Sequence, residues 1–261
     1  MSLPTIQNPE PTAAGDQVFY DDIQADRSVK QQGSIEKSSN YDIVPLFPCP
    51  VYIAGEKFPI EDGIEGGEQA KQGFREFVSN ETLGQYKNGM GNIISENTHI
   101  LDRPELSNLK DYIQKNLNTY AHEVMRIQDS CEFYITQSWI NFNKKGMRHL
   151  THTHQNSIIS GCFYIAGGNC PITFFHSSSP RFGMGGGFDF QYKDHNIYNS
   201  QSWWLNNENG RVVIFPSWVQ HQVAVNTHEE TRISLAWNTF FKGSVGDRRS
   251  LTELLMNKQF D

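Results

Sequence analysis

After Asp129 the apolar residues stop recurring at every third or fourth position and begin to alternate one by one. Successive side chains of a β-strand point to opposite faces of a sheet, so this period of two predicts half-buried strands. The segments that follow it are CEFYITQSWINFN, SIISGCFYIAG, GRVVIFPSW and TRISLAWNTFF, all rich in β-branched and aromatic residues. Several such strands in one chain predict a mainly β fold of the jelly-roll type.

A helical section precedes the strands, over about residues 60–128. Its pattern is weak at first and strong from Pro104, where a stripe of apolar residues predicts a helix lying on a sheet. Pro104 fits the first turn of that helix, and Asp102 is the expected N-cap. The stripe consists of Leu106, Leu109, Ile113, Leu117, Tyr120, Val124 and Ile127.

Composition along the chain predicts one domain with an arm. Residues 1–42 are polar and broken by Pro and Gly, which predicts a flexible N-terminal arm, and residues 43–261 form the single domain. The domain starts with an apolar, proline-containing edge strand in Ile43–Ile53, and its barrel spans about 129–242. Residues 176–209 form a Gly-, Ser- and Asn-rich insertion, interpreted as a lid or as a solvated loop that packs Trp203 and Trp204 on the barrel.

Charge and cysteine usage exclude some classes of partner. The formal net charge of −7 argues against a nucleic-acid-binding face. The four cysteines show no C-x-x-C spacing, which favours a reducing compartment over a disulfide framework. We see neither a signal peptide nor an apolar run of roughly 18 residues, so we expect a cytoplasmic protein with no membrane partner.

A dense group of histidines marks the candidate metal site. His152 and His154 are two residues apart in HLTHTHQNS, so both would point into the barrel if this segment is extended. His221, beyond the GRVVIFPSW strand, is the expected third ligand for a metal such as iron, cobalt, nickel, copper or zinc. His149 is off the alternation and is expected to be a nearby or surface histidine, and His176 has no spacing that requires it at the site.

The TRISLAWN segment carries a candidate anion site. Alternation places Arg232, Ser234 and Asn238 on one face of a strand. A buried guanidinium needs an anion, and its planar fork suits a carboxylate to which Ser234 could also donate. A surface ion pair of Arg232 with Glu229 or Glu230 is the alternative.

Taken in order, the H-x-H pair before SGCFYI, then GRVVIFPSWVQH, then RISLAWN resemble the 2-oxoglutarate and Fe(II)-dependent oxygenases. This family has many phage and marine bacterial members and is related to the prolyl 4-hydroxylases. The likeness runs from about Ile43 to Phe241 and is strongest from Ser138 to Asn238. It implies a double-stranded β-helix (jelly-roll or cupin-like) barrel with N-terminal helices packed on the sheet.

The resemblance also implies roles for particular residues. The iron ligands would be His152, His154 and His221, and Arg232 with Ser234 would bind the far carboxylate of 2-oxoglutarate. Asn141 and Tyr164 would be further cosubstrate contacts, and Trp139 and Asn238 would contact the substrate. In this family a carboxylate stands where this chain has His154, so the metal site would hold three histidines unless Asp189 or Asp194 of the insertion supplies the acid.

The expected function is therefore that of a non-haem Fe(II) and 2-oxoglutarate-dependent dioxygenase that takes O2 and releases succinate. Hydroxylation of a C–H bond in a peptide, a protein or a small molecule is the expected outcome, in the host cytoplasm if the gene is carried by a phage. Two alternatives stay open: a three-histidine cupin-type dioxygenase that uses no 2-oxoglutarate, and a non-catalytic jelly-roll binding module.

Overall fold

A computed structural model describes residues 48–60, 86–87, 91–167, 170–176, 191–206 and 208–256. The expected arm at 1–42, much of the weakly helical segment before residue 86, and the Gly-rich part of the insertion at 177–190 lie outside the described residues. Among the residues described, no helix is long and apolar enough to cross a membrane.

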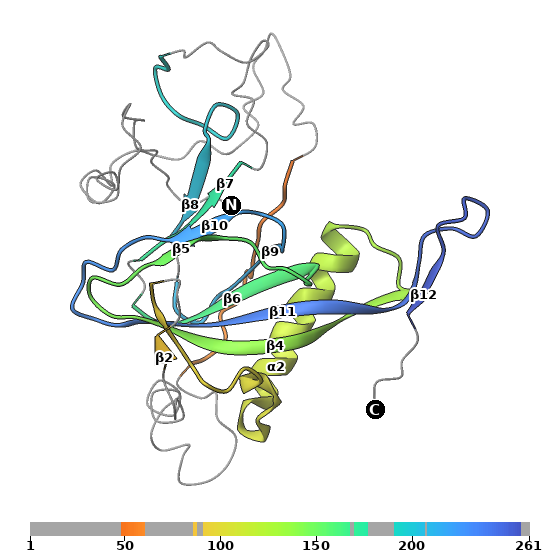
Figure 1. Ribbon diagram of the computed structural model, residues 1–261, viewed down its shortest axis with the longest axis horizontal. Coiled ribbons are helices and arrows are strands. Elements are labelled where there is room, and N and C mark those ends of the chain that lie inside the picture. The colour runs from red at the N-terminus through yellow and green to blue at the C-terminus, as the bar shows by residue number, and fades with distance from the viewer. Residues whose placement is uncertain are drawn as a thin grey trace.

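The predicted strands form the larger of two antiparallel sheets (Figure 1). Its order is β1-β9-β6-β11-β4-β3-β2, with β12 paired to β11, so β1 is an edge strand as its prolines predict. The strands are β1 (Tyr52–Ile53), β2 (Tyr86–Lys87), β3 (Ile93–Ile94), β4 (Cys131–Asn143), β6 (Ile159–Ala166), β9 (Val212–Pro216), β11 (Arg232–Val245) and β12 (Leu254–Met256).

Helices cover one face of this sheet (Figure 1). They are the 3-10 helices η4 (Ile100–Asp102) and η5 (Pro104–Leu106), the α-helix α2 (Ser107–Asn118) and the π-helix η6 (Thr119–Val124). The stripe residues Leu109, Ile113 and Leu117 of α2 are fully buried in a core with Leu235 and Trp237 of β11. This confirms the amphipathic helix and the face that it buries.

Two details of the helix prediction are wrong. Val124 is 44% exposed, because the wider turn of the π-helix rotates it off the apolar stripe. Asp102 does not cap α2, whose N-cap is Leu106; its carboxylate pairs with Lys110 at 2.8 Å.

The smaller sheet lies over the other face of the larger one and has the order β5-β10-β7-β8. Its strands are β5 (His149–His152), β7 (Ile172–Phe175), β8 (Ser202–Leu205) and β10 (His221–Val223). Strand β8 falls within the expected insertion, so Trp203 and Trp204 belong to the barrel and not to a loop. Strand β8 could not be predicted from the sequence, because its run of four residues is too short for the alternation to stand out.

Side chains from both sheets meet in a second core that includes Tyr164 of β6, Phe215 of β9 and Phe174 of β7. Two antiparallel sheets packed face to face, with helices outside the larger one, form the predicted double-stranded β-helix. The fold therefore places one face of β4, β6 and β11 inside the barrel.

Candidate metal and cosubstrate site

Three histidines converge at the β5 edge of the smaller sheet. His221 of β10 is the register partner of His152 of β5, and His154 follows two residues after β5 ends. The backbone N–H of His154 donates to the carbonyl of Ser217 at 3.0 Å, which holds this residue beside the β9–β10 turn. One ring nitrogen from each histidine lies within 4.8 Å of the other two.

The hydrogen bonds of the three rings determine which nitrogen carries the hydrogen. Nδ1 of His152 lies 2.7 Å from the carbonyl of Leu150, and Nδ1 of His221 lies 2.9 Å from the carbonyl of Val219. Nδ1 of His154 lies 2.5 Å from the amide oxygen of Asn238. These oxygens can only accept, so each Nδ1 donates and each neutral ring keeps the lone pair on Nε2.

Two of these lone pairs face each other. Nε2 of His154 and Nε2 of His221 are 3.2 Å apart, and with both Nδ1 atoms protonated neither Nε2 of the neutral rings has a hydrogen to share. Such a contact is repulsive without a cation. Imidazole nitrogens bound at about 2.1 Å to an octahedral metal are separated by about 3 Å, so the spacing fits a shared metal ion.

Burial keeps the rings neutral. It is the main cause that lowers the pKa of His154 to about 4, and it lowers the pKa of His152 and, further, that of His221. Neighbouring histidines add to the effect on His154 and His221. Neutral imidazole is the form that ligates metals.

A fourth histidine joins the group. The register between β5 and β10 shifts between the pairs His152↔His221 and His149↔Val223, which leaves one extra residue on β5. This bulge breaks the alternation and brings the ring of His149 onto that of His152, with 4.2 Å between centroids and 22° between planes. Burial, with the charges of His152 and Arg232 nearby, lowers the pKa of His149 to about 2.

Arg232 lies deeper in the barrel and is 2% exposed. Its Nε donates to the carbonyl of Cys170 at 3.2 Å, and its Nη1 donates to the hydroxyl of Ser234 at 2.8 Å. The alternative of a surface ion pair is wrong, because Arg232 is buried and Glu229 pairs with Lys145 instead. Among the described residues Arg232 forms no ion pair, so this buried cation has no protein counter-charge there.

Two polar side chains near Arg232 have no hydrogen-bond partner among the described residues. One is the buried hydroxyl of Tyr164, whose ring lies 5.3 Å from the Arg232 guanidinium carbon. The other is the buried amide of Asn143, the register partner of Arg232, whose oxygen and nitrogen both lack partners in the part of the chain described. Buried polar groups of this kind fit a polar ligand that would satisfy them.

The other predicted residues lie on the same inner face. Asn141 is the register partner of Ser234, and its amide oxygen accepts from Asn92 at 3.0 Å. The ring of Trp139 stacks on that of His154, with 5.9 Å between centroids. Asn238 contacts His154 directly.

Two of the remaining candidates do not join the site, and a third is not described. His176 is exposed, Asp194 is exposed and is not part of the histidine group, and Asp189 lies outside the described residues. The places of His149 and Asn143 could not be predicted from the sequence, because strand pairing and not residue spacing brings them to the site.

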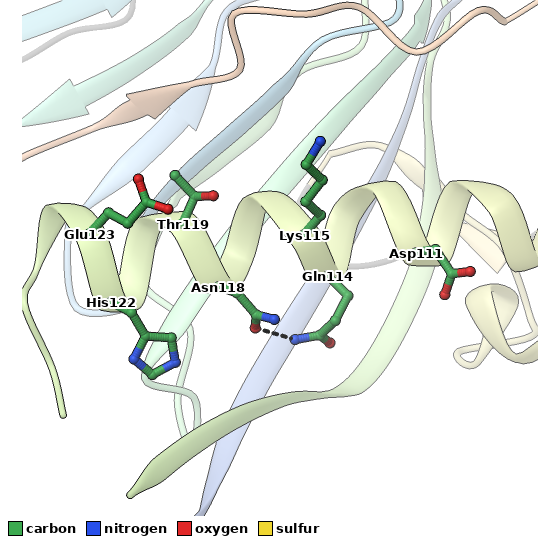
Figure 2. A pocket seen from close by; sticks show the side chains of 7 residues that line it. All are labelled: Asp111, Gln114, Lys115, Asn118, Thr119, His122 and Glu123. Atoms are coloured by element: carbon green, nitrogen blue, oxygen red, sulfur yellow. Dashed lines mark hydrogen bonds between the residues drawn. The ribbon is translucent and has the colours of Figure 1, made fainter. Parts of the chain in front are cut away.

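A separate polar hollow runs along the exposed side of α2 and η6 (Figure 2). Its side chains come from consecutive helical turns, and Gln114 donates there to Asn118 at 2.9 Å. It lies across the larger sheet from the histidines, since α2 packs on the opposite face. The converging groups are therefore those inside the barrel.

A family profile described as "Putative 2OG-Fe(II) oxygenase" matches residues 137–238. The match begins within β4 and ends within β11, and it includes the three histidines and Arg232. This part of the chain is therefore similar to the proteins that the profile describes as putative 2OG-Fe(II) oxygenases. A search of curated protein sequences gave no significant match.

Solved structures with a similar fold include several oxygenases. An oxidoreductase of the 2OG-Fe(II) oxygenase family from Burkholderia pseudomallei has 11% identity and a TM-score of 0.38 over 59% of this chain and 62% of that one. A prolyl-4-hydroxylase from Pseudomonas putida has 13% identity and a TM-score of 0.44 over 73% of this chain and 92% of that one. HygX from Streptomyces hygroscopicus, solved with nickel, 2-oxoglutarate and hygromycin B, has 9% identity and a TM-score of 0.43 over 73% and 82%. The match spans less than two thirds of the Burkholderia protein.

Proposed function

We propose that this chain is a dioxygenase that holds Fe(II) on the Nε2 atoms of His152, His154 and His221. The observation that carries the proposal is that one ring nitrogen of each histidine lies within 4.8 Å of the other two, while the hydrogen bonds of the three Nδ1 atoms leave each Nε2 lone pair free. The close Nε2 pair of His154 and His221 supports it further, because a cation between them removes their repulsion. A three-histidine ligand set is neutral, so the anionic cosubstrate would supply the compensating charge.

We propose that Arg232 and Ser234 bind the far carboxylate of 2-oxoglutarate, with Tyr164 and Asn141 as further contacts. The buried guanidinium has no counter-ion among the described residues and calls for an anion, and its fork matches a carboxylate. The unpartnered hydroxyl of Tyr164 has a hydrogen to donate to the same group. Asn143, which was not predicted from the sequence, would satisfy its own amide there.

When bound, Fe(II), 2-oxoglutarate and O2 supply the oxidising power for attack on a C–H bond, with release of succinate and carbon dioxide. The chain's own residues position these groups and exclude water. Phe174 and Phe215 pack around His221 with ring centroids at 5.9 and 4.7 Å, which keeps that ligand dry. We propose hydroxylation as the outcome, on a peptide, protein or small-molecule substrate that meets the site near Trp139.

An anaerobic titration tests this proposal. We expect Fe(II) and 2-oxoglutarate together, and neither alone, to produce a weak visible metal-to-ligand charge-transfer band, and O2 then to release succinate. The Arg232→Leu variant should lose the band at cosubstrate levels that saturate the parent, whereas Arg248→Leu, at an exposed position, should keep it. Arg232→Lys, which keeps the charge but not the fork, should raise the 2-oxoglutarate concentration needed by about tenfold or more.

Other outcomes would assign the chain differently. Oxygen consumption without 2-oxoglutarate, unchanged in the Arg232 variants, would indicate a three-histidine cupin-type dioxygenase. A protein that binds zinc but gives neither band nor succinate would be a binding module. Either result would overturn the proposal.

A further inference from the structure

A hydrogen-bonded chain of side chains lies behind His154. The amide oxygen of Asn238 accepts from Nδ1 of His154 at 2.5 Å and from the hydroxyl of Ser160 at 3.0 Å. The hydroxyl oxygen of Ser217 lies 2.7 Å from that of Ser160 and 2.8 Å from that of Ser157. Because Ser160 gives its one hydrogen to Asn238, the hydroxyl of Ser217 is the donor available to Ser160 or to Ser157, one at a time. The Asn238 oxygen therefore has two donors and a fixed position.

This series of hydrogen-bonded side chains is anchored to the backbone at Ser157. The backbone N–H of Thr239 donates to the hydroxyl oxygen of Ser157 at 3.1 Å, and Ser157 donates to the carbonyl of Ile159 at 3.1 Å. Ser160 and Ser217 are 0% and 1% exposed, so water does not compete for their hydroxyls. The amide of Asn238 is thus held by strands β6 and β11, which are register partners at Ser160 and Asn238.

His154 differs from the other two histidines in what holds its ring. Backbone carbonyls fix Nδ1 of His152 and of His221, and no side-chain substitution removes those acceptors. Only at His154 is the acceptor a side chain, and His154 is also the residue that stands where the family resemblance expects a carboxylate. Groups that accept from the second nitrogen of a ligating histidine set its tautomer and raise its basicity.

We propose that Asn238 is a positioning residue for this ligand: its amide oxygen holds the Nδ1–H tautomer of His154, so that Nε2 can bind the metal that the proposed function requires. This role differs from the substrate contact predicted for Asn238 from the sequence. It rests on the proposed function, because it matters only if His154 is a ligand.

Two substitutions at one position separate the acceptor from the shape of the side chain. Leucine at Asn238 cannot accept, and we expect Asn238→Leu to weaken Co(II) binding by about 10- to 100-fold, the range for loss of such partners. Aspartate accepts more strongly than an amide, so Asn238→Asp should bind Co(II) at least as tightly as the parent. Asn118→Leu, on the exposed side of α2, is the matched control and should leave the affinity unchanged.

Proton NMR of the Co(II)-loaded protein gives a readout that a general loss of packing would not move. Ring N–H protons of ligating histidines appear there as shifted, exchangeable signals, and the parent should show three. Asn238→Leu should lose one by fast exchange and keep two, while Asn238→Asp should keep all three.

The outcomes separate the inference from the function. A parent that binds no Co(II), or shows no histidine N–H signals, overturns both. A parent with three signals whose Asn238→Leu variant keeps its affinity and all three signals overturns the inference alone. If Asn238→Leu does not fold, the comparison of Asn238→Asp with Ser160→Ala tests the acceptor role of Asn238. Weaker Co(II) binding in Asn238→Asp than in Ser160→Ala would contradict that role.

Discussion

The ring of His149 packs against that of His152, a proposed metal ligand. The two rings stack with 4.2 Å between their centroids. The carbonyl of Leu150 fixes the ring of His152 as well, through its contact with Nδ1 of His152. Stacked aromatic pairs contribute about 0.5–1.5 kcal/mol beyond the area that they bury. His149 therefore restricts the orientation of His152 without being one of the three converging ligands.

We expect His149→Ala to weaken Co(II) binding by about 2- to 10-fold, because His152 loses its stacking partner. His149→Phe keeps a flat ring and should stay close to the parent. A competition titration with a metal indicator measures both. Equal losses in the two variants would mean that the imidazole nitrogens of His149, and not its ring face, act at the site.

Residue spacing alone predicts part of this site. Alternation along a strand pairs His152 with His154, and the structure brings these two together with His221, which was expected from its place beyond a strand. For Arg232 alternation left a surface ion pair open, and only the family resemblance gave it a role at the site. His149 does not follow, because a bulge appears only when two strands are paired. The unpartnered Tyr164 hydroxyl is equally invisible in the sequence, since satisfaction of a polar group depends on its neighbours in space.

Strand β6 joins the two cores of the molecule. Tyr164 and Cys162 point into the barrel, while Gly161 lies under Trp237 of β11 on the helical side. A Cβ atom at Gly161 would lie 2.1 Å from Cζ2 of Trp237, whose side chain is fully buried. This strand therefore needs glycine for a close approach and not for its backbone angles.

We expect Gly161→Ala to lower the free energy of unfolding by about 1–3 kcal/mol, as overpacked cores do. Urea denaturation measures the change. Gly55→Ala is the matched control, because a Cβ there meets nothing within 4 Å. A loss no larger than that of the control would show that the indole moves aside at no cost.

The main elements could be predicted because their patterns are long. Strands β4, β6, β9 and β11 each coincide with an alternating segment. The four-residue β8 and the π-helix η6 could not, because a short strand carries too few alternations and a π-helix differs from an α-helix by one hydrogen-bond step. Tertiary contacts decide whether these two segments form a strand and a π-helix.

At the scale of the whole molecule, the barrel keeps four histidines neutral near a buried guanidinium in a protein whose formal net charge is −7. The charge excess therefore lies outside the site. An interior of this kind disfavours protonation of the histidines and would favour an anion or a metal–anion pair. The sequence gives the overall charge but not this separation, because it does not say which histidines are buried.

The metal-free protein should lose stability as the pH falls. The folded pKa of His154 is about 4, below the usual value of about 6.5, so the unfolded chain binds protons that the folded chain excludes. The contribution of the neutral His154 to the free energy of unfolding is then fully present above about pH 6.5. It decreases as the pH falls toward 5, before most carboxylates titrate. Thermal melts across this range measure it.

His154→Phe removes one of these groups and should make the pH dependence shallower. Melting temperatures that do not change between pH 7 and pH 5, or a variant with the slope of the parent, would contradict the account of buried neutral imidazoles.

The most direct measurement is a crystal structure of the protein grown anaerobically with Fe(II) and 2-oxoglutarate, with anomalous scattering recorded at the iron edge. We predict one anomalous peak about 2.1 Å from Nε2 of His152, His154 and His221, with the far carboxylate of 2-oxoglutarate on Arg232. No peak among these nitrogens, or iron bound elsewhere while the three rings keep their present contacts, would contradict the account.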